Sequence, residues 1–203
     1  MNRNTLISRQ GLVPLLAATL AAVLVLHFIG LRESLAFWGL GLLVLVLFRD
    51  PERDIPSIPL TVLSPADGRV VVIEKTDDPY LRRPSLKVTI NMNAYGVFTT
   101  RSPIGGKVLE PPSIIDGKLH PHGVWLQTDE GDDIVLVMNR GRLNNKPRCY
   151  IRFGDRVGQG KRCGFVHLGG LVDMYLPENS QPLVAVGAAV QAGSDVIARL
   201  IHG

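Results

Sequence analysis

Histidine and cysteine are the residues that most often bind metals or act as nucleophiles, and this sequence contains few of them. His120 and His122 are separated by a single proline, so both imidazoles belong to one short loop. Zinc sites generally use three or four protein ligands, and two imidazoles fall short of that number. Cys149 and Cys163 form no C-x-x-C motif and are too few for a disulfide framework. We therefore expect a solvated loop, two reduced thiols and no metal site.

Two further residues are compatible with either a structural or a catalytic role. Asp67 lies in the sequence Ser-Pro-Ala-Asp-Gly, where an aspartate before glycine commonly accepts backbone N–H groups in a turn. The same carboxylate, held beside a reacting group, can accept a proton. His167 is either a strand residue with its ring at the surface or a functional imidazole. The residue types favour the structural interpretation of both.

Positive charge is concentrated between residues 140 and 162. This stretch holds eight Lys or Arg residues and a single acid, Asp155. Near an anionic bilayer each such cation contributes about 1 kcal/mol of attraction. The stretch lacks the interleaved aromatic residues that nucleic-acid binding uses for base stacking, so we expect no nucleic-acid partner. We predict either a solvated face or a surface that binds anionic lipid headgroups through Arg140, Arg142, Arg148, Arg152, Lys161 and Arg162.

The composition indicates a membrane segment joined to a globular domain. The chain has 203 residues, of which 46 % are hydrophobic and 20 % charged, with a net charge of +4. Residues 11–48 contain only two charged residues, so the apolar excess is concentrated there. Such a composition excludes a disordered chain. The sequence pI of 9.3 suits an anionic membrane surface as a partner.

Two apolar stretches make up the N-terminal region. Residues 11–30 carry no formal charge, and a helix of this length spans about 30 Å, enough to cross a hydrocarbon core. Residues 35–48 form a shorter arm after a break at residues 31–34. The first stretch is too long for a cleaved signal peptide. We predict a retained hairpin with both chain ends in the cytoplasm, because arginines flank it on both sides: Arg3, Arg9, Arg49 and Arg53.

Beyond the hairpin, the pattern is that of an all-β domain. Short runs rich in β-branched residues alternate with turn pairs such as Asp-Gly and Gly-Gly, as in sandwiches and barrels. Strands are expected at residues 69–74, 86–90, 108–109, 123–127, 134–138, 148–153, 164–168, 171–176 and 196–200. The chain is thus expected to have three parts: a membrane hairpin (1–49), a proline-rich linker (50–60) and a cytoplasmic β-domain (61–203).

The form Gly-x-x-Val-x-x-Gly occurs twice, at residues 154–160 and 187–193. In each copy we expect the glycines to supply positive φ angles and the valine to enter the core. Two such corners predict a flattened, quasi-symmetric β-sandwich of the barrel-sandwich type, like the lipoyl and biotinyl carriers. Those carriers present a lysine at a hairpin tip. Neither corner here has one, so we expect no swinging-arm role.

Four motifs follow the apolar hairpin in order. They are FRDPER at 48–53, LSPADGRV at 63–70, RSPIGGKV at 101–108, and GDRVGQGKR at 154–162 running into VDMYLP at 172–177. Together they cover nearly the whole chain, and they resemble the short, membrane-anchored form of phosphatidylserine decarboxylase.

The resemblance implies a cofactor that the protein makes from itself. In this family a serine that follows a glycine attacks the preceding carbonyl, the chain breaks, and the serine becomes an N-terminal pyruvoyl group. Its ketone forms a Schiff base with the amine of phosphatidylserine and accepts electrons as carbon dioxide leaves. An aspartate of the S-P-x-D-G motif and a histidine before the R-x-P motif are implicated in the proton transfers.

Only one of these positions is retained when the family's residues are carried over. Asp67 matches the aspartate. The serine position is Gly170, which follows Gly169 and has no hydroxyl, so no pyruvoyl group can form at this bond. The histidine position is Phe98, which cannot exchange a proton. The resemblance therefore implies a protein without the family cofactor.

The sequence favours a pseudoenzyme of the inner membrane, with its β-domain in the cytoplasm, that binds lipid headgroups or a partner. That partner would be an active decarboxylase or another lipid enzyme. The alternative is an active carboxy-lyase that converts phosphatidylserine to phosphatidylethanolamine and carbon dioxide with an unorthodox nucleophile. The one Gly-Ser pair, Gly193-Ser194, belongs to a different corner, and cleavage there would release only ten residues.

Overall fold

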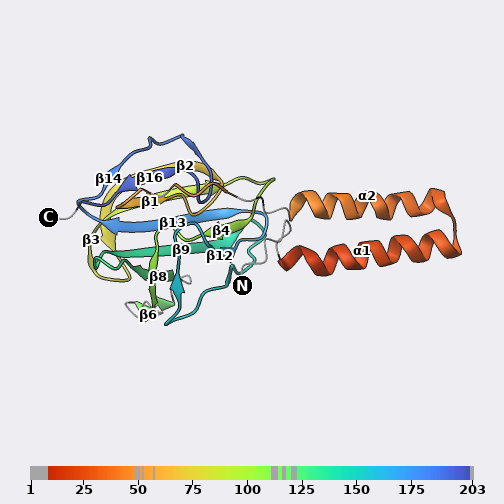
Figure 1. The fold of residues 1–203 in the computed structure, drawn as a ribbon, viewed down its shortest axis with the longest axis horizontal. Helices are drawn as coiled ribbons and strands as arrows, with labels where there is room; N and C mark the ends of the chain where they lie inside the picture. The colour runs from red at the N-terminus through yellow and green to blue at the C-terminus, as the bar shows by residue number, and fades with distance from the viewer. Residues whose placement is uncertain are drawn as a thin grey trace. The chain divides into compact units, whose positions relative to one another are not determined.

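The computed structural model describes residues 9–48, 51, 53–56, 58–110, 114–115, 118–119 and 123–201. The chain divides into two compact units. One comprises Met1–Glu52 with Tyr95–Val97, and the other comprises Arg53–Ala94 with Phe98–Gly203. As predicted, the fold is mostly β-sheet with an N-terminal helical hairpin (Figure 1).

The hairpin consists of helices α1 (Arg9–Phe28) and α2 (Leu31–Leu47). The chain reverses at Gly30, whose φ of 141° is rarely adopted by residues with a side chain. The break was expected at residues 31–34, but these residues form the first turn of α2. The buried hydroxyl of Ser34 donates to the carbonyl oxygen of Ala22 at 3.0 Å and so ties the second helix to the first.

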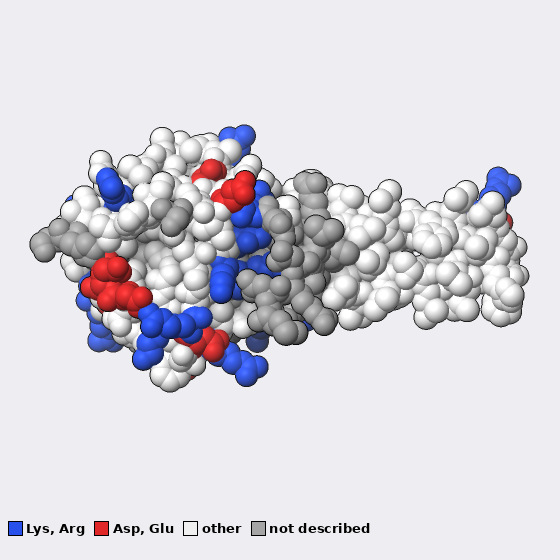
Figure 2. All heavy atoms as spheres, in the orientation of Figure 1, with Lys and Arg blue, Asp and Glu red and all other residues white. Residues whose placement is uncertain are grey.

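The surface of the hairpin is suited to lipid. Large apolar side chains such as Leu16, Phe28 and Leu42 are exposed along both helices. Figure 2 shows the described part of the hairpin as almost uncharged, in contrast to the β-unit. One segment of the described chain, Gly11–Phe28, is long and apolar enough to cross a membrane.

The second unit contains the strands, which are short apart from β2, β3, β9 and β13. Their bounds are β1 Thr61–Leu63, β2 Gly68–Asp78, β3 Arg83–Met92, β4 Thr99–Arg101, β5 Gly106–Leu109, β6 Ile114–Ile115, β7 Lys118–Leu119, β8 Gly123–Gln127, β9 Asp133–Gly141, β10 Arg148–Cys149, β11 Arg156–Val157, β12 Arg162–Phe165, β13 Gly170–Pro177, β14 Gln181–Pro182, β15 Ala189–Val190 and β16 Val196–Arg199.

One eight-stranded sheet and two three-stranded sheets enclose the main core. The large sheet has the order β11-β5-β8-β9-β13-β3-β2-β15, and the small sheets have the orders β1-β16-β14 and β4-β12-β10. Buried side chains from all three sheets, such as Ile90, Met174, Ile197 and Cys163, belong to one apolar cluster. The alternation of buried and exposed residues along β13 is typical of a strand with one face in the core.

An approximate two-fold repetition relates the two halves of this unit. From the central pair β9 and β13 outward, the large sheet continues as β8-β5-β11 on one side and β3-β2-β15 on the other. The N–H of Val70 donates to the carbonyl oxygen of Ala188, and the carbonyl oxygen of Val70 accepts the N–H of Gly187. Val108 makes the same pair of bonds with Asp155 and Gly154. The predicted quasi-symmetry therefore extends to individual backbone hydrogen bonds.

The two Gly-x-x-Val-x-x-Gly corners have the predicted geometry. The first and last glycines of each corner have positive φ angles, 87° and 72° in the first corner and 92° and 75° in the second. Val157 and Val190 are both buried. The repeated spacing in the sequence was therefore a reliable sign of a repeated corner.

Two expected strands are shorter than predicted. The strand expected at 148–153 ends at Cys149, because the chain turns around Gly154 and the Asp155 carboxylate accepts the N–H of Arg152 at 2.7 Å. The strand expected at 164–168 ends at Phe165, before Leu168 with its positive φ of 55°.

Gly106 marks a place where two strands approach too closely for a side chain. A Cβ atom here would overlap the carbonyl oxygen of Gln127, whereas a Cβ at the neighbouring Gly105 would have no atom closer than 3.4 Å. The difference provides a matched pair of substitutions.

We expect Gly106→Ala to lower the free energy of unfolding by about 2–3 kcal/mol, because a backbone oxygen cannot move aside as a flexible side chain can. For a chain of this size that is a fall in Tm of roughly 4–12 °C in thermal unfolding. Gly105→Ala should leave Tm nearly unchanged. Equal Tm values for the two variants would contradict the close approach.

Candidate functional site

Two of the positions singled out by the family resemblance, Asp67 and Gly170, lie at one end of the large sheet. Gly68 of β2 pairs with Met92 of β3, and Gly170 of β13 pairs with Gly141 of β9. Since β3 and β13 are also neighbours, four adjacent strands have their ends here. Asp67 immediately precedes β2, and so it lies at the same end of the sheet as Gly170.

The carboxylate of Asp67 is fully engaged by other parts of the chain. Its Oδ1 accepts the N–H of Ala192 at 2.7 Å, and its Oδ2 forms an ion pair with Arg53 at 2.5 Å. Arg53 also donates to the side chain of Gln191 at 3.1 Å. The Asp67 and Arg53 side chains are only 14 % and 13 % exposed. Asp67 thereby fastens the residues after the hairpin to the second glycine corner.

Phe98 is part of a row of aromatic rings. It is buried and meets Phe165 edge-on, with ring centroids 6.1 Å apart, and Phe165 meets His167 in the same way at 5.0 Å. The carbonyl oxygen of Phe98 accepts the N–H of Val166 at 2.9 Å. Edge-to-face contacts of this kind stabilise a core beyond the area they bury. The ring of Phe98 therefore has a packing role.

Gly169 and Gly170 occupy a crowded turn. Gly169 has a φ of 71°, and a Cβ there would lie 2.7 Å from the carbonyl oxygen of Asn93. A Cβ at Gly170 would lie 3.1 Å from the carbonyl oxygen of Arg140 and 3.2 Å from the side chain of Val166. A serine at position 170 would require these neighbours to move by a few tenths of an ångström.

His167 differs from the expectation of a strand residue with its ring at the surface. It follows the end of β12, and its ring is half-buried against Phe165. Its Nδ1 atom is buried without a hydrogen bond. Burial, reinforced by the positive charge of Arg148, lowers the pKa of His167 below its usual value.

The thiols show no sign of activation. Burial raises the pKa of Cys163 to about 12, and partial burial of the thiol raises the pKa of Cys149, although the residue as a whole is exposed. Among the residues that the structure describes, no three His, Cys, Asp or Glu side chains are grouped as they would be around a metal ion. His120 and His122 lie outside the described residues.

Most of the predicted headgroup-binding residues are exposed. Arg162 is half-buried, and the exposed ones are Arg140, Arg142, Arg148, Arg152 and Lys161. β10 ends at Cys149, so Arg148 and Arg152 do not lie on one continuous strand. Arg156, from the same basic stretch, forms an ion pair with Asp129.

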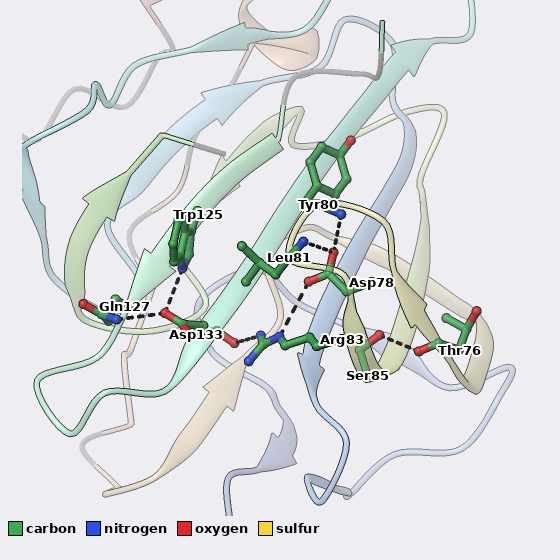
Figure 3. A network of polar contacts seen from close by, with 9 residues as sticks. All are labelled: Thr76, Asp78, Tyr80, Leu81, Arg83, Ser85, Trp125, Gln127 and Asp133. Atoms are coloured by element: carbon green, nitrogen blue, oxygen red, sulfur yellow. Dashed lines mark hydrogen bonds and ion pairs between the residues drawn. The ribbon is translucent and has the colours of Figure 1, made fainter. Parts of the chain in front are cut away.

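A second polar network lies away from these residues, at the turn between β2 and β3 (Figure 3). The buried carboxylate of Asp78 accepts the N–H of Tyr80 at 2.8 Å. Arg83 lies between Asp78, 3.8 Å away, and the backbone oxygen of Asp133, to which it donates. The Asp133 carboxylate accepts the indole N–H of Trp125 at 2.8 Å. Each of these residues has at least one partner within the protein, which indicates a structural role, although Asp78 Oδ2 and Arg83 Nε face each other without forming a hydrogen bond.

Sequence reasoning identified the FRDPER motif but missed that Arg53 binds Asp67. Nothing in the local pattern reveals the pairing, because the other partners, Gln191 and Ala192, come from the far end of the chain. Arg53 was assigned only to the charges that flank the apolar region, and its proximity in sequence to the carboxylate of Asp67 was the one available sign of the pair.

Comparison with known proteins identifies the family. The sequence profile of phosphatidylserine decarboxylase matches residues 40–125 and 122–198. The chain belongs to the phosphatidylserine decarboxylase family. The phosphatidylserine decarboxylase proenzyme of Nitrosomonas eutropha is 36 % identical, covering 95 % of this chain and 94 % of its own length. That of Cupriavidus metallidurans is 39 % identical, with coverage of 96 % and 95 %. The glucose permease IIA of Mycoplasma capricolum, a solved structure, matches with 20 % identity and a TM-score of 0.46, over 68 % of this chain and 94 % of its own.

A structural role for Asp67 in this family member predicts coupled losses of stability. We expect Asp67→Ala and Arg53→Ala each to lower the free energy of unfolding by about 2 kcal/mol, because hydrogen bonds to charged groups contribute about 1.5–3 kcal/mol. The double variant should lose at least about 1 kcal/mol less than the sum, since the two residues share one interaction. Denaturant unfolding measures all three. Strict additivity would show that the ion pair contributes nothing.

Proposed function

We propose that this protein is a membrane-anchored member of the phosphatidylserine decarboxylase family that does not cleave itself and acts without a pyruvoyl group. The observation that carries the proposal is the glycine at position 170, where the resemblance assigns the nucleophilic serine. A glycine has no hydroxyl to attack the preceding carbonyl, so the acyl shift that begins cofactor formation has no nucleophile.

Two further features support the proposal. Phe98, at the position assigned to the histidine, has its ring packed against Phe165 and carries no exchangeable proton. Asp67, the retained aspartate, has both carboxylate oxygens engaged by Arg53 and Ala192. Of the three groups required for the proton and acyl transfers, the serine and the histidine are thus replaced, and the aspartate is bound within the structure.

We expect the purified chain to have an intact mass of 22.1 kDa and no reaction with a carbonyl-reactive hydrazide. A second arm uses the Gly170→Ser/Phe98→His variant, which reinstalls a hydroxyl and an imidazole. Appearance of fragments only in that variant would show directly what the natural chain lacks. Fragments or a blocked new N-terminus in the natural chain would overturn the proposal.

The relatives favour one alternative, because proteins named as proenzymes match this chain over 94–95 % of their own length. In that alternative, the chain is an active decarboxylase with a different nucleophile. Ser194 follows a glycine with a φ of 75° and is the candidate. Release of decarboxylated lipid by the natural chain, lost in Ser194→Ala, would establish the alternative.

We further propose that the protein acts at a lipid surface, as a headgroup-binding protein or as a companion of an active decarboxylase or another lipid enzyme. The apolar segment Gly11–Phe28 supplies an anchor, and the exposed cations of residues 140–162 supply an attraction for anionic headgroups. Because the chain joins the two, the anchor would tether the β-unit to the bilayer.

Binding of the β-unit to anionic vesicles tests the role of charge. Residues 53–203, which retain Arg53, should co-sediment with anionic vesicles but not with neutral ones, and binding should fall as salt shortens the Debye length from ~10 Å at 0.1 M to ~3 Å at 1 M. Arg148→Glu/Arg152→Glu should weaken binding by about tenfold or more, at roughly 1 kcal/mol per charge.

Lys75→Glu/Arg199→Glu provides the matched control, because both residues are exposed and lie outside the basic stretch. Lys75 forms an ion pair with Glu178, but the pair is exposed and contributes little to stability. Arg83 is unsuitable, since its reversal would disturb the network around Asp78. A cooperative thermal transition is required of every fragment. Equal binding to neutral and anionic vesicles would leave the basic stretch as a solvated face.

The proposed location is the inner membrane, with both chain ends in the cytoplasm, because arginines flank the apolar region on both sides. Reporters that are active only in the cytoplasm should be active when fused before Met1 and when fused after Gly203. Digestion of the β-unit by protease added outside the inner membrane would contradict the proposed orientation.

A further inference from the structure

Residues 140–148 comprise the end of β9, the connection to β10 and the first residue of β10, and hydrogen bonds hold the backbone of the connection. Gly141 N–H donates to the carbonyl oxygen of Asn145 at 3.0 Å, and Asn144 N–H donates to that of Gly141 at 2.8 Å. Asn144 has a φ of 58°, a conformation that asparagine tolerates better than most residues. We name this segment the 140–148 loop.

The side chains of the 140–148 loop combine one exposed apolar residue with a group of cations. Leu143 is 66 % exposed. A single exposed leucine is ordinary on a protein surface. Here, however, the sequence around it contains no acid, and four cations flank it, all exposed: Arg140, Arg142, Lys146 and Arg148.

The loop is attached to the end of the sheet where the family positions lie. Arg142 N–H donates to the carbonyl oxygen of Gly169 at 3.1 Å, and its guanidinium donates to that of Met92 at 3.2 Å. Gly141 pairs with Gly170. These contacts attach the residues that precede Leu143 in sequence to the segment that contains Gly169 and Gly170.

We propose that the 140–148 loop is a second membrane contact, which inserts Leu143 among the acyl chains of an anionic bilayer while its cations bind the headgroup phosphates. The proposal rests on the membrane association put forward above and identifies the part of the β-unit that makes the contact. Its consequence is that Gly169 and Gly170 lie next to the lipid headgroups.

The chemistry commits the loop to an anionic lipid surface rather than to a neutral one. Transfer of an aliphatic side chain out of water is favourable wherever an apolar phase is within reach. The cations cannot follow Leu143 into the hydrocarbon, so they remain at headgroup level, where phosphates neutralise them. The hydrogen-bonded backbone also favours insertion, because the loop loses little conformational freedom when it binds.

An environment-sensitive fluorophore at position 143 tests the insertion in the full-length protein. The labelling background is Cys149→Ser, because Cys149 is exposed whereas Cys163 is fully buried and unreactive. Leu143→Cys is labelled with nitrobenzoxadiazole and reconstituted in nanodiscs. One preparation contains phosphatidylcholine, and the other an equimolar mixture of phosphatidylcholine and phosphatidylglycerol. Leu183→Cys, a position 52 % exposed with no charged neighbour in sequence, is the matched control.

We expect the label at position 143 to shift to the blue, and to be quenched by lipids brominated on their acyl chains, in the anionic nanodiscs only. The label at position 183 should respond in neither. Adding Arg140→Glu/Lys146→Glu should abolish the response at 143, and salt should reduce it. Thermal unfolding confirms that each labelled variant is folded.

The outcomes separate this proposal from the function it rests on. Unchanged fluorescence at position 143 in both nanodiscs overturns insertion. A blue shift at 143 without quenching by brominated chains, as contact with a bound protein would give, also overturns it. An equal response in neutral and anionic nanodiscs overturns the role of the cations. Self-cleavage, detected by intact mass, would overturn the proposed function while leaving the loop result unaffected.

Discussion

Two segments of the β-unit bind each other through reciprocal main-chain hydrogen bonds, and the remaining structure is arranged around this crossing. Leu63 N–H donates to Pro103, and Arg101 N–H donates to Pro65, at 2.9 and 2.8 Å. All four residues are buried, so leaving either amide without its partner would cost a full desolvation penalty. Because the two segments have the same Ser-Pro-x-x-Gly pattern, one crossing fixes the start of β2 and of β5 together. From these two strands, the sheet is built outward with the same corner at each side.

The sequence predicted this architecture from the spacing of glycines and valines, because φ angles and burial act locally. The corners at Gly154 and Gly187, and the strands at β8, β9 and β13, were recognisable for that reason. The position of the helical turn and the ends of β10 and β12 were not. These depend on single residues, such as Gly30 and Leu168, whose φ angles no periodicity reveals. The Arg53–Asp67 pair was also hidden, since nothing in a local pattern specifies a partner from a remote segment.

Under the proposed function, the candidate site would lack the groups for catalysis while the fold is kept. The backbone that surrounds Gly170 still joins β13 to β3 and β9. Phe98 contributes to an aromatic row with Phe165, an arrangement that supports packing rather than proton transfer. Asp67 is tied to both the hairpin-proximal segment and the second corner, which gives this residue a structural role independent of chemistry. The presence of Asp67 is therefore not by itself a sign of activity.

The pairing of β1 with β16 has a consequence for synthesis. Thr61 pairs with Arg199, so the first strand of the β-unit has no partner until almost the whole chain has been made. At about 5–20 residues per second, translation of the intervening segment takes on the order of ten seconds. The apolar helices leave the ribosome at the start of that interval. Sheets closed by such distant pairings fold slowly, and strand edges that wait unpaired are prone to aggregate. With the anchoring proposed above, early membrane insertion of the helices would tether each nascent chain to the bilayer during this wait.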